Sequence, residues 1–135
     1  MPQAPSLQAH ITSLLVCGDA FTDEKGRIHV YSIFDTVGAA GFPFDLSFTV
    51  FCKVQGEGTH TAFFTIVDSL DEEIIKTDAM PFEVSFTKGH SFLLGVATRF
   101  GAPGLYKVKG FLDGMPEIEV PLMVRRAEED QEKES

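Results

Sequence analysis

A chain of 135 residues is the usual size of one domain and leaves little room for two hydrophobic cores, so we expect a single domain. Hydrophobic residues make up 44% of the chain and charged residues 23%, a globular balance that excludes wholesale disorder. The formal net charge of −9 repels phosphate backbones and anionic lipids, so we expect neither nucleic acid nor a membrane as a partner.

Residues 1–8 are expected to form a flexible N-terminus. They contain neither a cationic start nor an apolar run, so they do not resemble a secretory signal. No apolar stretch approaches the roughly 18 residues that a membrane-spanning helix requires. Both features favour a cytoplasmic location, where Cys17 and Cys52 would stay reduced. Each cysteine lies in an apolar strand pattern, which predicts a structural role for both.

Alternation of apolar and polar residues with a period of two predicts that residues 9–124 form a domain of β-strands. The alternation recurs over 28–34, 44–54, 82–87, 92–99, 106–112 and 117–124. Two further segments, 10–17 and 61–67, are apolar on both faces, which is typical of central strands that are covered on both sides. We therefore expect an all-β, two-sheet antiparallel sandwich, immunoglobulin-like, with about seven to nine strands.

Turn residues separate these runs. Residues 23–26 are expected to turn the first strand into the second, and 56–58 to separate the third from the fourth. Asp113-Gly114 predicts a tight hairpin before the last strand. Pro121 lacks an N–H, so the last strand is expected to lie at a sheet edge or to carry a bulge there.

Two segments differ from the alternating runs. The connection 35–43 is longer than usual and carries Val37 and Phe42 among small residues. These side chains either tuck under the sandwich, which the usual burial of Phe favours, or stay exposed as an apolar patch for a partner. Phe51 and Tyr31, on the more solvent-exposed faces of their predicted strands, would extend such a patch. Residues 125–135 are almost wholly polar and are expected to form a charged, disordered tail.

Residues 14–21, 23–27 and 32–35 resemble the opening of a small bacterial domain family of unknown function. Members of that family continue with a Phe-Pro element, here Phe42-Pro43, and carry an Asp-Gly turn before the last strand. The similarity covers roughly residues 10–124 and rests on turns and core positions. It implies a β-sandwich, often taken to be immunoglobulin-like, and no activity. One departure is Asp71, where members tend to carry the glycine of an Asp-x-x-Gly turn.

No motif points to catalysis, to a metal or to a cofactor. The four histidines, His10, His29, His60 and His90, lack the local spacing of metal ligands. There is no Gly-x-Ser-x-Gly elbow, and the glycines at 38 and 41 lack the lysine and helix of a phosphate loop. We therefore expect no enzyme, no catalytic residue, no metal site and no cofactor.

Two kinds of function remain open. The first is a non-catalytic module that binds a protein partner, or itself, through a sheet edge or apolar loop, with Val37, Phe42, Phe51 and Tyr31 as candidate binding residues. The second is a small-molecule or carbohydrate binding domain that uses the loops at one end of the sandwich. Fold-level analogy favours the first.

Overall fold

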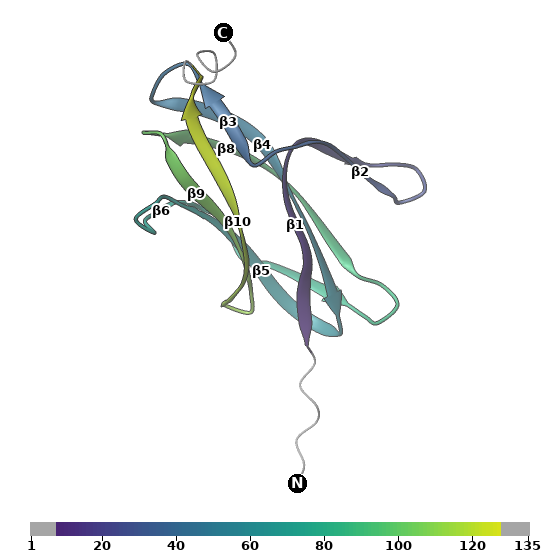
Figure 1. Cartoon of the computed structure of the whole chain (residues 1–135). Helices are drawn as coiled ribbons and strands as arrows, with labels where there is room; N and C mark the ends of the chain where they lie inside the picture. Colours follow the sequence, from purple (N-terminus) through teal and green to yellow (C-terminus); the bar gives the residue numbers. More distant parts are fainter. Residues whose placement is uncertain (1–7, 128–135) are drawn as a thin grey trace.

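The computed structural model describes residues 8–127, and these form ten strands in two sheets that pack against each other (Figure 1). Sheet A contains β2 (Ile28–Ile33), β1 (Ala9–Thr22), β4 (Phe44–Gly56) and β8 (His90–Phe100), in that order. Sheet B contains β3 (Thr36–Ala39), β10 (Met115–Arg126), β9 (Gly104–Leu112), β5 (Gly58–Val67) and β6 (Glu73–Lys76). The short strand β7 (Met80–Val84) pairs with the first half of β5.

The prediction of an all-β, two-sheet fold is confirmed, but the described residues contain more strands than the seven to nine expected. Two short strands, β3 and β6, contribute to the excess because four residues are too few to show a clear alternation. The pairing of β3 with β10 is parallel, whereas the other strand pairs are antiparallel. The segment 35–43, expected to be a loop, thus adds an edge strand to sheet B.

The core lies between the sheets and is built from alternate positions of the long strands. In sheet A, Leu14 and Val16 of β1 lie opposite Cys52 and Val50 of β4, and all four are at most 4% exposed. From sheet B the core receives Ala62, Phe64, Ile66, Val108, Leu112, Leu122 and Val124. Phenylalanine fills much of the space between the sheets, as its abundance in the sequence suggests.

The expected turns hold the strands in place. Asp113 and Gly114 have φ angles of 52° and 81°, and Leu112 pairs with Met115, so a two-residue hairpin joins β9 to β10 as predicted. The Asp68 turn keeps its shape without the glycine because Asp71 itself has a φ of 61°. The Asp68 carboxylate accepts hydrogen bonds from two backbone N–H groups in that turn, of Leu70 and Glu72.

The edge prediction at Pro121 is also confirmed. On one side Pro121 pairs with Lys107 of β9, while β3 pairs with β10 only from Met123 onward. The missing N–H of Pro121 therefore leaves no hydrogen bond of the ladder unmade. Strand β10 continues to Arg126, two residues beyond the expected domain boundary at 124. The rest of the expected tail, 128–135, and residues 1–7 of the expected N-terminus lie outside the described residues.

The connection between β4 and β5 carries the chain from sheet A to sheet B. Gly56 and Gly58 both have positive φ angles, 148° and 97°. A Cβ at Gly56 would overlap the carbonyl oxygen of Gln8 and lie 2.5 Å from Cα of Ala9. The start of β1 therefore packs on this corner, which requires glycine at position 56.

Candidate functional site

The outer face of sheet A carries an apolar band. The register places Leu15, Phe51 and Leu93 in one row across β1, β4 and β8. These positions alternate with core positions, so their side chains point away from the core and are only half-buried. In the next row Ile33 of β2 pairs with Cys17, and its side chain is 61% exposed. We call Leu15, Ile33, Phe51 and Leu93 the apolar band.

Cys17 lies under this band and outside the core. It alternates with Val16 and pairs with Thr49, so it faces outward, yet it is fully covered. Burial raises the pKa of the Cys17 thiol, and the charge of Asp19 adds to the effect. Cys52 faces the core on the other side of sheet A, and burial raises its pKa to about 12. The two cysteines are free thiols on opposite faces, and neither has the character of a nucleophile.

The hairpin of β1 and β2 extends the band toward solvent with three stacked rings. It projects from the body of the sandwich (Figure 1). The ring of Phe21 stacks on His29 at 4.8 Å and on Tyr31 at 5.6 Å between centroids. Phe21 and Tyr31 are 44% and 50% exposed. Register places all three rings on one face of the hairpin, and Ser32, with a φ of 57°, lies between them and Ile33.

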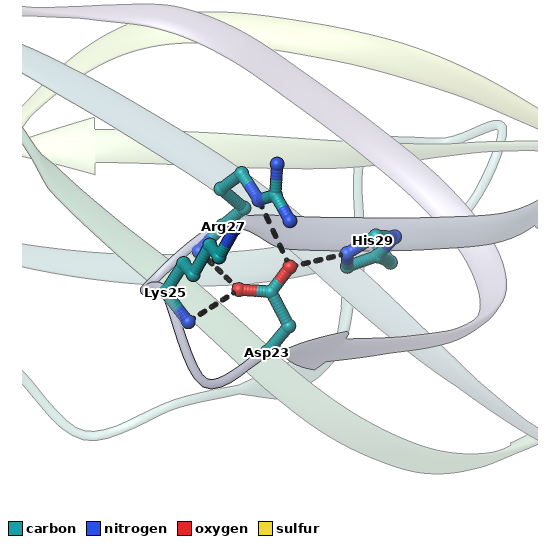
Figure 2. Close-up of polar contacts among 4 residues, drawn as sticks. All are labelled: Asp23, Lys25, Arg27 and His29. Carbon is teal, nitrogen blue, oxygen red and sulfur yellow. Dashed lines mark hydrogen bonds and ion pairs between the residues drawn. The ribbon is translucent and has the colours of Figure 1, made fainter.

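Asp23 fixes the shape of this hairpin (Figure 2). Its Oδ1 accepts hydrogen bonds from the backbone N–H groups of Lys25 and Arg27, each at 2.9 Å. Its Oδ2 accepts from His29 Nε2 at 2.8 Å and from Arg27 Nε at 3.1 Å. The bond from His29 and those from Arg27 and Lys25 lower the pKa of the Asp23 carboxyl to about 2. Both carboxylate oxygens are engaged, so Asp23 holds the hairpin rather than offering a free ligand.

A shallow hollow of about 360 Å³ opens beside the band. It is lined by Gly18, Ser47, Phe48, Thr49, Gly95, Val96 and Ala97. It lies where the pairing of β1 with β4 ends, at Cys17 and Thr49. A raised apolar band beside a hollow is a shape that a side chain of another protein can complement.

The outer face of sheet B is different because charged side chains cover it. Lys107 and Lys109 each lie 3.9 to 4.0 Å from the carboxylates of Asp71 and Glu119. The Lys76 ammonium lies 4.8 Å above the ring of Phe63, which stacks on Phe111. These charges keep that face hydrated. Sheet B thus mixes charged groups with the stacked rings of Phe63 and Phe111, whereas the row of Leu15, Phe51 and Leu93 on sheet A is apolar throughout.

An ion pair between the buried His60 and the half-exposed Asp113 lies at the end of the sandwich where β4 passes into β5. His60 Nδ1 lies 2.6 Å from Asp113 Oδ2, and Nε2 donates to the carbonyl oxygen of Glu57 at 2.7 Å. His60 is 7% exposed. Since a carboxylate and a carbonyl can only accept, the protonated imidazole, with hydrogen on both ring nitrogens, satisfies both contacts. Both nitrogens of His60 are committed to the structure, as is its partner Asp113, which also accepts from the N–H of Thr61.

The four candidate binding residues fall into two groups. Phe51 lies in the apolar band and Tyr31 in the adjoining ring stack, so the structure brings these two onto one surface. Val37 lies in β3 and Phe42 before the cis Pro43, and both pack against the core. This outcome is the tucked alternative for segment 35–43. The guanidinium of Arg126 lies over the Phe42 ring in a cation–π contact, 5.3 Å from the ring centroid.

Sequence reasoning missed Leu15, Ile33, Leu93 and Phe21. The signal was present in segment 10–17, which is apolar on both faces. That pattern predicts a strand covered on both faces. In the described residues no layer lies over the outer face of β1, and Leu15 there is only half-buried. The same pattern thus marks an apolar outer face here.

Residues 8–127 contain no group of three or more His, Cys, Asp and Glu side chains arranged to hold a metal ion. The same residues contain no helix with the length and apolar character that crossing a membrane requires.

Comparisons with solved structures give distant matches. The chain resembles the crystal structure of a putative beta-galactosidase from Bacteroides fragilis, with 16% identity and a TM-score of 0.54 over 87% of this chain. It also matches the Pseudomonas fluorescens alkylpurine DNA glycosylase AlkC bound to DNA with an abasic site analog, with 11% identity and a TM-score of 0.49 over 87% of this chain. The chain spans 17% and 30% of the length of those proteins.

No curated protein matches the sequence. A family model, described as a family of unknown function (DUF6941), matches residues 12–125 and so covers both sheets. The resemblance to an uncharacterised domain family is therefore confirmed, and the chain belongs to the family of unknown function DUF6941.

Proposed function

We propose that this domain is a non-catalytic module that binds another protein through the outer face of sheet A. The contrast between the two outer faces supports the proposal. Sheet B presents lysines and carboxylates, whereas sheet A presents Leu15, Ile33, Phe51 and Leu93 beside the rings of Phe21 and Tyr31. A contiguous apolar surface with aromatic side chains at its end is typical of protein-binding sites.

The rigidity of the hairpin adds support. Four hydrogen bonds to the Asp23 carboxylate fix the turn, and ring stacking fixes Phe21 against His29 and Tyr31. A preformed aromatic surface loses little conformational entropy when a partner binds. The two free, covered thiols are compatible with a reducing compartment, and a cytoplasmic location is part of the proposal. The immunoglobulin-like assignment is also part of it, supported by the two open sheets.

A small-molecule or carbohydrate site at the loops has less support. The hairpin tip has an open hollow of about 450 Å³ lined by residues 21–25 and Arg27. Its carboxylate, however, already accepts four hydrogen bonds within the hairpin. A ligand there would meet few unsatisfied polar groups, and such groups normally fix a ligand's orientation.

Site-specific photocrosslinking in the native host tests the protein-binding proposal. A photoreactive phenylalanine analogue replaces Ile33, which is 61% exposed within the band, or Phe86, which is 88% exposed and lies between β7 and β8. We expect one or a few discrete crosslinked proteins from position 33 and only background from position 86. Equal background at both positions would contradict the proposal.

A matched pair of substitutions completes the test. Ile33→Lys places a charge in the apolar band, and Phe86→Lys places the same charge at the control position. Both side chains are exposed, so neither change disturbs the core. We expect Ile33→Lys to reduce recovery of the crosslinked partner from a probe at Tyr31, and Phe86→Lys to leave recovery unchanged.

A further inference from the structure

Strand β8 is an edge strand without the features that usually keep sheet edges apart. Natural edges are short, interrupted by proline or bulges, or guarded by lysine. The edges of sheet B follow this rule. Strand β3 has four residues, β6 has four and a register shift against β5, and β7 has five and contains Pro81. The open part of β10 carries Pro116 and Pro121 and a register shift.

In contrast, β8 is long and regular. Its eleven residues pair one to one with β4, from Val54 opposite His90 to Phe44 opposite Phe100, with no register shift. It contains neither proline nor lysine. Its single charged residue, Arg99, is held by both carboxylate oxygens of Asp45, at 2.8 and 3.2 Å. On its other side no strand pairs with β8 among the described residues, so a row of backbone donors and acceptors stays open there.

Charge makes this edge accessible to a second copy of an acidic protein. The chain as a whole has a net charge of −9. Strands β4 and β8 together contain one acidic residue, Asp45, and two basic residues, Lys53 and Arg99, which is a formal charge of +1. Two copies that meet along β8 therefore bring together strands that do not share the negative charge of the whole chain, so electrostatic repulsion between the copies is weakest there.

We propose that β8 is a self-association edge at which a second copy of this chain adds its own β8 in antiparallel orientation, joining two four-stranded sheets into one. A two-fold axis makes such an interface self-complementary. Full overlap of the eleven residues places the axis at the midpoint, Gly95. Leu93 then lies opposite Ala97 of the second copy, and Ser91 opposite Arg99 of the second copy. No like charges face each other.

Gly95 itself fits this placement. Glycine weakens a strand interior, and it often marks a close approach of another backbone. A Cβ at position 95 would meet no atom within 4 Å, and its φ is not in the left-handed region. The packing of a single copy therefore does not require glycine there, while two backbones meeting at an axis gain room from it.

This proposal concerns the edge of sheet A and does not depend on the foreign partner proposed for its outer face. In the paired state the apolar bands of two copies lie on one continuous sheet. The two proposals are separated by their readouts. Because Gly95 also lines the hollow beside the apolar band, Gly95→Lys is scored by the mass of the dimer, whereas Ile33→Lys is scored by crosslinking to the partner.

The experiment measures the mass of the full chain by light scattering over a concentration series. We expect the wild-type mass to rise from 14.8 kDa toward twice that value. Gly95→Lys places two ammonium groups opposite each other at the axis, so we expect the dissociation constant to rise at least about tenfold. Ile33→Lys is expected to dimerise like the wild type. A wild type that remains monomeric, or a dimer that survives Gly95→Lys, overturns the proposal.

A second variant covers the case in which Gly95→Lys misfolds. Under mild oxidation, Gly95→Cys is expected to give a disulfide-linked dimer, because directly opposite Cβ atoms in an antiparallel pair lie near the distance a disulfide spans. The control, Phe86→Cys, replaces a residue that is exposed like Gly95 but lies off the edge, and it is expected to remain monomeric. Equal crosslinking of both variants, or of neither, contradicts pairing along β8.

Discussion

Replacing His60 tests the ion pair that this buried histidine forms with Asp113. Burial by itself lowers the pKa of His60, but the hydrogen bonds to Asp113 and to the Glu57 carbonyl, with the charge of Asp113, outweigh it and raise the pKa above 6.5. The bond from His60 is the main cause that lowers the pKa of Asp113 below 3.8. The Thr61 N–H and the charge of His60 lower it further, while partial burial acts in the opposite direction. The pair is therefore strongest between about pH 4 and 6.5.

The sign of the pH dependence follows from these directions. A histidine whose pKa is raised on folding contributes fully below its unfolded pKa, and that contribution is lost as the pH rises through its folded pKa. The aspartate contributes above its unfolded pKa and loses its contribution as the pH falls through its folded pKa. We therefore expect the stability of the wild type to decline on the alkaline side, as His60 loses its charge, and on the acid side, as Asp113 gains a proton.

The size of the effect follows from the two hydrogen bonds. Both bonds come from the imidazole of His60, which is 7% exposed, and hydrogen bonds to a charged group contribute about 1.5 to 3 kcal/mol each. The bond to Asp113 lies at the low end of that range because the Asp113 side chain is 52% exposed and water screens it. Allowing glutamine to recover part of the total, we expect His60→Gln to lower the free energy of unfolding by about 2 kcal/mol at pH 5.5. At pH 9 the neutral histidine keeps one donor, so the difference is expected to fall to about half.

Urea unfolding of both proteins at pH 5.5 and pH 9 measures these differences. The control is His10→Gln, since His10 is 66% exposed and pairs with Glu117 at the surface. His10→Gln is expected to change the free energy of unfolding by less than about 1 kcal/mol at both pH values. Nitrogen-edited NMR at pH 6 is expected to show hydrogen on both ring nitrogens of His60. A single protonated nitrogen, or an equal loss of stability at both pH values, would refute the reasoning.

Three further predictions concern other parts of the fold. The Asp23 carboxyl is expected to titrate with a pKa of about 2 in carbon-detected NMR, and His29→Ala should raise that value because the histidine bond is its largest cause. Gly56→Ala is expected to lower the free energy of unfolding by about 3 kcal/mol, because the backbone there has a positive φ and the added Cβ would overlap neighbouring backbone atoms. The control, Gly41→Ala, adds a Cβ that meets nothing within 4 Å and is expected to change the stability little. Thermal unfolding of the two variants measures the difference. Both cysteine thiols are expected to react with a thiol reagent only at the rate of unfolding, because both are fully covered and burial raises both pKa values, that of Cys52 to about 12. Rapid reaction of the native protein would contradict this.

The surface proposed for binding was only partly visible in the sequence. Tyr31 and Phe51 were identifiable because each is an aromatic residue at an otherwise polar position of an alternating strand. Leu15 and Ile33 were not, because an apolar residue in a strand carries no mark of which layer, if any, covers it. Val37 and Phe42 attracted attention as apolar residues in an apparent loop, but pairing with the last strand, more than 80 residues away, turns that segment into β3.

The sequence by itself determined the features that depend on neighbouring residues: the period-two strands, the Asp113-Gly114 hairpin and the edge position of Pro121. Their cause is local, since side-chain alternation, positive φ angles and a missing N–H act within a few residues. Only the tertiary structure decided which apolar face of β1 is covered, that β8 lies at an edge, and that His60 meets Asp113 across 53 positions. Those outcomes depend on strand order and register, which arise from contacts between distant segments and leave no periodic trace in either segment.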